Sequence, residues 1–248
     1  MEPGMDFAAD SIQGVLFLSP SQHQDDALKL WDILFPNDPP DGFQRATPTS
    51  PALNSSAHGD RQGFQTTVNA QVGRIDLILA QSPQVQPSDS GPPRIAEVHG
   101  AAIKAAEFLK RLARQLKAFR AAMVIDLSKT VQTGNEAAEI IGYLPGFPFP
   151  ANVSDLGLQF NSRKSFQFST DFEMNRMCTW SSGQVGFVKG PNMQPSSMVV
   201  LTPYVGLKID VNSAPQLPLP FDKIPTAIDE LTTEALAIES EGVTRLIS

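Results

Sequence analysis

The sequence predicts an α+β fold of two tandem β-α-β(n)-α units, in which antiparallel sheets each pack against a long helix. Three observations carry this prediction. Apolar residues after Pro92 recur at steps of three and four, which is typical of one face of a helix. After Asp155 short segments alternate between apolar and polar residues, which is typical of antiparallel strands with one solvated face. The order strand, helix, strands and helix can also be followed twice along the chain.

We expect the chain to divide into three parts. Residues 1–10 are predicted to be a disordered N-terminus, residues 11–118 the first α+β unit, and residues 119–248 the second unit with a larger antiparallel sheet. Residues 36–63 of the first unit are rich in Pro, Asp, Asn, Ser, Thr and Gly, and no helix or strand can be read from them. Since a structureless connection of this length is uncommon inside a compact domain, we predict a mobile loop there.

The first unit begins with an apolar run at residues 12–18 that favours a buried strand. An amphipathic helix is predicted after it, with Ser21 or Asp25 as its N-cap and Pro36 as its end. Residues 64–80 alternate, but their apolar positions change parity near Gly73, which predicts two strands joined by a turn or bulge.

The long helix of the first unit is predicted to start near Arg94, because prolines at positions 92 and 93 suit a first helical turn. Its apolar stripe is Val98, Ala102, Ala105, Leu109, Leu112, Leu116, Phe119 and Met123. The last two residues also suit the buried strand predicted at residues 121–127, so the helix is expected to end between positions 116 and 122.

The second unit continues with a short helix that starts at Thr133 or Asn135. The strands predicted after it lie near residues 156–161, 165–170, 172–180, 184–189, 198–202 and 204–212. Ser181-Ser182-Gly183 predicts a hairpin turn between two of them. A closing helix is expected from Phe221 or Pro225 to just before Gly242.

A short sequence echo connects the two halves. Val72-Gly73-Arg74-Ile75-Asp76-Leu77 precedes a Pro-rich loop and a helix, and Val205-Gly206-Leu207-Lys208-Ile209-Asp210-Val211 does the same. The echo has two explanations, an internal duplication or a coincidence between short strand-like strings.

Composition limits the possible functions. The chain has 248 residues, of which 41% are hydrophobic and 18% charged, and a net charge of −7 opposes general binding to nucleic acid or anionic membranes. No apolar run approaches the length of a membrane span and no signal peptide is present, so we expect a soluble, cytoplasmic protein. The single cysteine, Cys178, excludes an internal disulfide and a Cys-rich zinc site.

No recognised catalytic motif occurs in the sequence. Glycine-rich nucleotide loops, a His-Glu-x-x-His pair, a Gly-x-Ser-x-Gly elbow and a Cys-x-x-Cys pair are all missing, so we predict no cofactor and no metal. This favours a protein that is not an enzyme, while a catalytic site assembled from distant residues stays open. Cys178 alternates with apolar residues on one strand and is predicted to be a buried hydrophobe.

The long helix concentrates positive charge. Residues 94–120 hold seven basic and two acidic side chains, a net charge of +5, so the remainder of the chain carries −12. Lys104, Arg111, Arg114 and Lys117 form the candidate binding face for phosphates or an acidic protein surface. The other interpretation is the solvated side of an amphipathic helix.

Asp76 and Asp210 are the only carboxylates with a counterpart in the echo, since each follows an isoleucine on a predicted strand. As paired carboxylates they are expected either to bind a cation or to pair with Arg74 and Lys208. The alternative is that they are solvent-side charges that protect a sheet from aggregation.

These features predict a non-enzymatic interaction or scaffold protein that forms homo-oligomers or binds a protein partner through its helices or sheet edges. Two alternatives stay open. One is a small-ligand-binding or enzymatic domain with its site between sheet and helix. The other is nucleic-acid binding through the basic helix, which the lack of interleaved aromatic residues disfavours.

Overall fold

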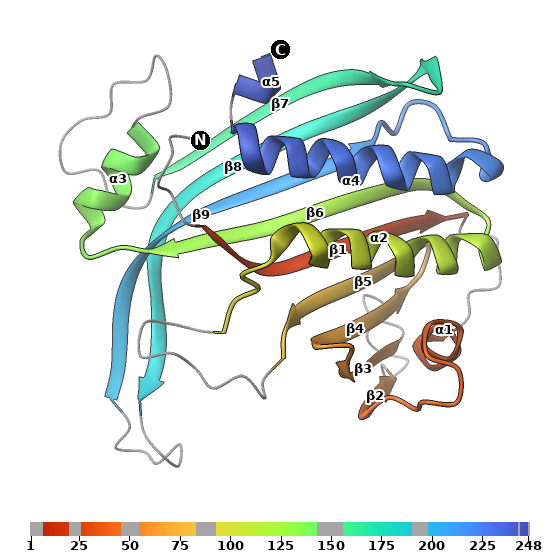
Figure 1. The fold of residues 1–248 in the computed structure, drawn as a ribbon, viewed down its shortest axis with the longest axis horizontal. Coiled ribbons are helices and arrows are strands. Elements are labelled where there is room, and N and C mark those ends of the chain that lie inside the picture. The colour runs from red at the N-terminus through yellow and green to blue at the C-terminus, as the bar shows by residue number, and fades with distance from the viewer. Residues whose placement is uncertain are drawn as a thin grey trace.

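The structure, a computed structural model, describes residues 7–19, 26–45, 55–82, 93–142, 156–189, 198–242 and 244–247. Its centre is one antiparallel sheet with the strand order β2-β3-β4-β5-β1-β6-β9-β8-β7 (Figure 1). The strands are β1 (Ala8–Leu18), β2 (Gly42–Arg45), β3 (Ser55–Arg61), β4 (Phe64–Gln71), β5 (Arg74–Gln81), β6 (Ala118–Thr130), β7 (Gly157–Phe166), β8 (Ser169–Lys189) and β9 (Met198–Ser213).

The predicted α+β class is therefore confirmed, but the sheet is shared by the two halves of the chain. The sequence predicts one antiparallel sheet for each half. In the structure β1 and β6 pair at the centre, with Ile12 opposite Ile125, and the strands of both halves form one continuous sheet. Both central strands are largely apolar on the face that the helices cover, so each can lie in the interior of one shared sheet.

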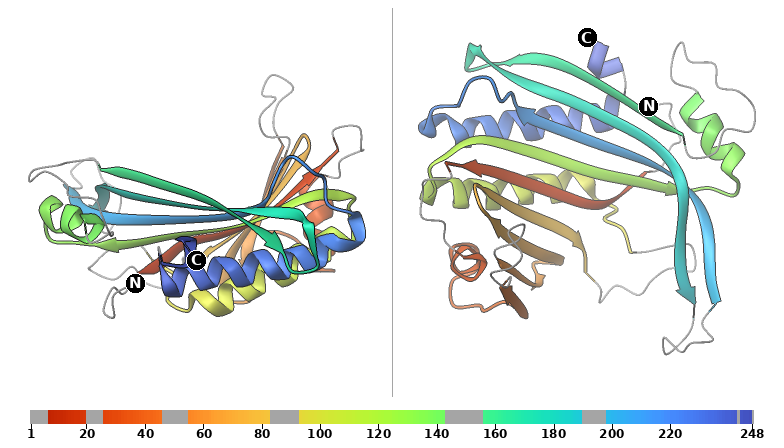
Figure 2. Two further views of the ribbon diagram at one scale, coloured as in Figure 1. Left: turned by 90° about the horizontal axis from the view of Figure 1, so that it is seen from above. Right: turned by 180° about the vertical axis from the view of Figure 1, so that it is seen from behind.

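The helices cover one face of this sheet. They are α1 (Ala27–Leu34), α2 (Val98–Gln115), α3 (Gly134–Gly142), α4 (Ile224–Glu241) and α5 (Thr244–Ile247), with a 3-10 turn at Phe221–Lys223 before α4. The long helices α2 and α4 lie antiparallel and side by side on that face, as the two further views also show (Figure 2). No helix in the described ranges is both long and apolar enough to cross a membrane.

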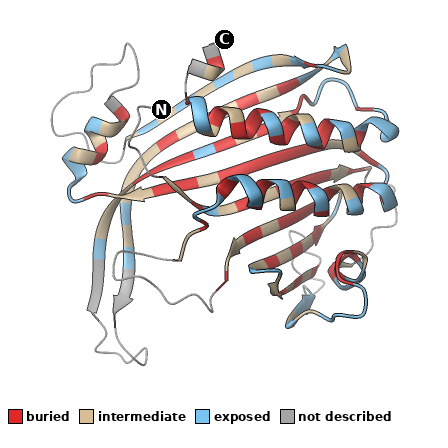
Figure 3. Cartoon of the chain, viewed as in Figure 1, coloured by how far each residue is buried: buried red, intermediate tan, exposed pale blue. Residues whose placement is uncertain are grey.

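The core lies between the two long helices and the sheet (Figure 3). The predicted stripe of the first long helix is confirmed from Val98 to Leu116, because all six of its residues in that span are buried. The helix begins at Val98, where the Glu97 side chain accepts a hydrogen bond from the Gly100 amide at 2.6 Å. It ends at Gln115, so Phe119 and Met123 belong to β6.

Two predicted local features are confirmed, and the predicted N-cap of the first helix is wrong. The turn between β4 and β5 falls at Val72 and Gly73, and Gly73 has a φ of 71°, a conformation that glycine adopts at little cost. Thr133 caps α3 by accepting a hydrogen bond from the Glu136 amide at 3.1 Å. The cap of α1 is Asp26 rather than either predicted residue, and positions 21 and 25 lie outside the described residues.

Two predictions of irregular structure differ from the fold. The predicted loop at residues 36–63 contains β2 and β3, whose polar sequences carry little strand propensity and which form by pairing with β4. The predicted hairpin turn at residues 181–183 is wrong, because β8 runs through it without a break. Gly206, Val205 and Tyr204 of β9 pair with these three residues and hold them extended.

Candidate functional site

The sheet has a face that no described helix covers, and we call it the helix-free face. In the rear view of Figure 2 the strands lie in front of α2 and α4. Phe17 lies on this face near the C-terminal end of the central strand β1, between its cross-strand neighbours Arg74 on β5 and Arg120 on β6. The guanidinium carbons of Arg74 and Arg120 lie 5.7 and 4.7 Å from the centroid of the Phe17 ring, within the range of cation–π interactions.

Asp76 lies two residues after Arg74 on β5 and is only 2% exposed. Arg74 forms an ion pair with it at 2.7 Å, which is one of the two outcomes expected from the sequence. Gln13 and Gln71 donate side-chain hydrogen bonds to its two oxygens at 2.8 and 3.1 Å. The carboxylate is thus fully engaged by polar groups of its own sheet.

Asp210 lies on the same face but on β9, three strands away from Asp76 on β5. At the usual spacing between strands the separation is roughly 14 Å, too far for two carboxylates to share one cation. Asp210 accepts a hydrogen bond from Asn212 at 2.8 Å, and Asn212 accepts one from Asn175. Lys208, the expected partner of Asp210, pairs instead with Asp126 at 3.7 Å.

Arg120 is the least compensated cation of the helix-free face. Its Nε donates to the Ser213 carbonyl at 3.1 Å, and it forms no ion pair within the described parts of the chain. Burial lowers the pKa of Arg120 below its usual value, while the charge of Asp210 acts in the opposite direction. Asp76 and Asp210 therefore offset the charge of the two arginines on this face.

The predicted basic face of α2 is partly neutralised within the molecule. Lys104 pairs with Glu107 at 3.1 Å. Arg111 lies over the Phe108 ring, with its guanidinium carbon 5.6 Å from the ring centroid. Arg114 and Lys117 are exposed at the end of the helix. In addition Lys110, which faces α4, pairs with a carboxylate of that helix at 2.6 Å.

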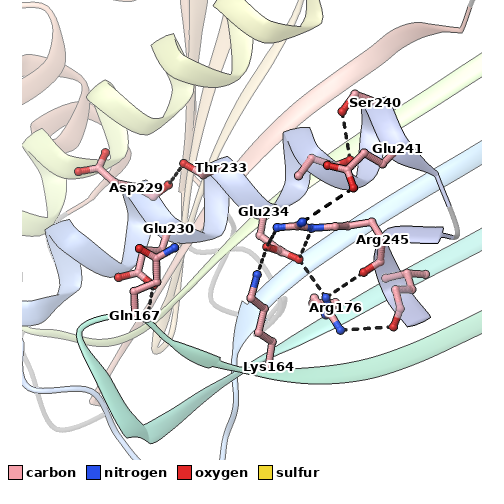
Figure 4. Close-up of polar contacts among 12 residues, drawn as sticks. Lys164, Gln167, Arg176, Asp229, Glu230, Thr233, Glu234, Ser240, Glu241 and Arg245 are labelled. Atoms are coloured by element: carbon pink, nitrogen blue, oxygen red, sulfur yellow. Dashed lines mark hydrogen bonds and ion pairs between the residues drawn. The ribbon is translucent and has the colours of Figure 1, made fainter. Parts of the chain in front are cut away.

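A buried ionic cluster, which sequence reasoning missed, connects α4 to the edge of the sheet (Figure 4). The Glu234 side chain on α4 is 5% exposed and accepts hydrogen bonds from Lys164, Arg176 and Arg245. Arg245 binds both carboxylate oxygens, at 3.1 and 2.9 Å. Burial by itself would raise the pKa of Glu234, but hydrogen bonds from Arg245, Lys164 and Arg176 outweigh it and lower the pKa to about 2.

The same cluster fixes the short helix α5. The Arg176 side chain is 6% exposed, and its two amino groups donate to the backbone carbonyls of Arg245 and Leu246 at 3.0 and 3.3 Å. These bonds hold α5 against the inner face of the sheet edge. The one sequence signal that could have indicated this role is a glutamate among the apolar positions of α4, and it was not used.

Strands β8 and β9 extend beyond the rest of the sheet as a two-stranded ribbon. β7 ends beside Ser181, and β6 ends beside Tyr204. Beyond these points residues 184–189 of β8 pair with residues 198–203 of β9 and with no other described strand, and we call these two segments the arm. Figure 1 shows the two strands bending away from the sheet. α3 contacts both strands.

The arm is unusually apolar and almost uncharged. Seven of its twelve residues are Val, Phe, Met or Leu, and Lys189 is its one charged residue. The side chain of Leu201 is 61% exposed. The sequence signal was the apolar run at residues 198–201, but separate strands were predicted for residues that form two long ones.

The remaining candidates do not form a site. Burial raises the pKa of Cys178 to about 12, against the opposing charge of Arg176, so its thiol is protonated and unreactive. The interface between sheet and helix is closely packed at Gly14, where an added Cβ would lie 2.9 Å from Leu109. Within the described ranges no three His, Cys, Asp or Glu residues are grouped so that they could hold a metal ion.

Comparisons with known proteins give no further guide. No protein-family model, no curated protein and no solved structure matches this chain.

Proposed function

We propose that this chain is a non-enzymatic interaction or scaffold protein that associates with itself. The observation that carries the proposal is the arm, an apolar ribbon that extends past the sheet and pairs only with itself among the described strands. A two-stranded ribbon is marginal in water, and three or more strands or a packed face are needed to stabilise it. Leu201 in the described part of the arm is 61% exposed, and exposed apolar side chains next to an unpaired strand edge suit a protein interface.

Measurement of the mass in solution tests this proposal. Size-exclusion chromatography with light scattering should give a multiple of the 26.8 kDa chain mass at micromolar concentrations, with dissociation on dilution. A mass of one chain at every concentration, up to the highest that stays in solution, would refute self-association.

The nucleic-acid alternative receives less support. Of its candidate residues, Lys104 is paired and Arg111 is packed on an aromatic ring, which leaves a smaller basic surface than the sequence predicts.

We also infer that the chain arose by duplication of a β-α-β(n)-α unit. The strand order is nearly symmetric about the β1–β6 pair, so that β5 and β9 occupy equivalent places. α2 and α4 each have 18 residues. Adding 126 to the number of each buried residue of α2 gives a buried residue of α4 in eight of nine cases. Phe108 corresponds in this way to Glu234, so the ionic cluster occupies the place of an apolar core residue.

A further inference from the structure

We propose that the arm joins two copies of this chain by antiparallel pairing of their β8 strands, centred on Gly186. This inference rests on the self-association proposed above and names its site and its geometry. It follows from the direction of the backbone groups, the charge of the arm and the symmetry of the pairing.

Among the described strands, none pairs with the outer edge of β8 beyond Ser182. The Ser182 amide donates across this edge to the Leu156 carbonyl, at the end of the part covered by β7. Residues two apart in a strand direct their N–H and C=O groups to the same side, so Gln184 and Gly186 present theirs to this edge beyond the reach of β7. Unpaired groups in such a row are a template for another strand.

The outer edge of β9 is less suited to pairing. The Val131 amide donates to the Pro203 carbonyl at 3.0 Å. The backbone groups of Pro203 therefore point to the outer edge of β9. Proline has no N–H to donate to a neighbouring strand, and it interrupts that edge at the base of the arm. The structure therefore favours β8 as the edge that accepts a second copy.

The charge of the arm suits a second copy of the same chain. Each copy carries a net charge of −7, so two copies repel each other over most of their surface. The arm contains no carboxylate, and it is the part where two copies can approach with little repulsion. Pairing centred on Gly186 also places Lys189 opposite Gly183 of the other copy and keeps the two lysines apart.

The symmetry of this contact limits it to a dimer. Antiparallel pairing of identical strands is isologous, so the contact closes on itself around a two-fold axis. It would convert two ribbons about 20 Å long into one four-stranded sheet. Four strands exceed the minimum that an antiparallel sheet needs for stability in water.

Three variants of the full chain test this inference. Gly186→Pro removes an outward N–H that no described strand accepts, and Leu201→Glu introduces charge into the arm. Val72→Glu is the control, because Val72 lies in the turn between β4 and β5 and is 64% exposed, close to the exposure of Leu201. Mass is measured by light scattering over a range of concentrations, and circular dichroism reports the fold.

We expect a dimer for the wild type and for Val72→Glu, and a dimer dissociation constant raised at least about tenfold in Gly186→Pro. Leu201→Glu should raise it by a smaller factor, because Leu201 lies on β9, one strand away from the paired edges. If Gly186→Pro does not fold, Gln184→Pro, which removes the other outward N–H of this edge, decides the question. A dimer that both folded arm variants retain at wild-type strength would overturn the arm as the contact while leaving self-association intact. A dimer that Val72→Glu also loses would overturn the inference too. A wild type that is monomeric throughout would refute the proposed function itself.

Discussion

Replacing Glu234 with glutamine removes the negative charge on which three basic side chains converge, and it keeps the size of the side chain. Lys164, Arg176 and Arg245 would then lie together without a counter-charge at their centre, and Arg176 is almost fully buried. Breaking a buried ion pair by removal of one partner costs about 3–5 kcal/mol, because the other charge stays buried and unpaired. For a chain of 248 residues this corresponds to a fall in Tm of roughly 6–20 °C.

The pH dependence of the wild type should report the same carboxylate. Its pKa is about 2 in the folded protein and close to 4.5 when unfolded, so the stabilisation is present above pH 4.5 and is lost as the pH falls from 4.5 towards 2. Urea denaturation at several pH values measures this loss. Glu234→Gln should be less stable at pH 7 and should lack this component of the acid-induced destabilisation.

Glu241→Gln is the matched control, because Glu241 is about half exposed and lies 3.8 Å from Arg245. An exposed pair of this kind contributes at most about 1 kcal/mol. A loss below 1 kcal/mol in Glu234→Gln, or an equal loss in the two variants, would contradict the assignment of Glu234 as the centre of the cluster.

Three further predictions concern packing, reactivity and the two halves. Gly14→Ala should lower the free energy of unfolding by about 1–3 kcal/mol in chemical denaturation, because its Cβ would overlap with the Leu109 side chain. An unchanged free energy of unfolding would contradict close packing of α2 against the sheet at this position. Cys178 should react with a thiol reagent only after denaturation, and rapid reaction in the native protein would contradict its burial and raised pKa. Residues 1–117 and 118–248, co-expressed as separate chains, should co-purify through the β1–β6 pair and the α2–α4 contact, whereas independent behaviour of the two would contradict a shared sheet.

The sequence predicted best those elements whose pattern reflects burial. The stripe of α2 and the change of parity at Gly73 both follow from which side chains enter the core, and the structure confirms both. β2 and β3 could not be predicted in this way, because their side chains are mostly polar and their strand form depends on β4. The Ser-Ser-Gly signal at residue 181 failed for the same reason, since pairing with β9 overrides it.

The candidate sites show a similar limit. Alternation along a strand indicates which face a residue occupies, and Asp76 and Asp210 do share a face. It does not indicate strand order, so it could not show that β1 and β6 separate the two carboxylates. The partners of Glu234 come from β7, β8 and α5, and no local spacing in the sequence connects them.

A distance between two copies tests the central claim most directly. Gln184→Cys carrying a nitroxide label places one probe beside Gly186, and the buried Cys178 should not take up the label. With β8 strands paired around Gly186, pulsed electron paramagnetic resonance should give a distance between the two labels on the order of 15–25 Å. A sample that is dimeric by mass but gives only distances well above this range would contradict arm-to-arm association.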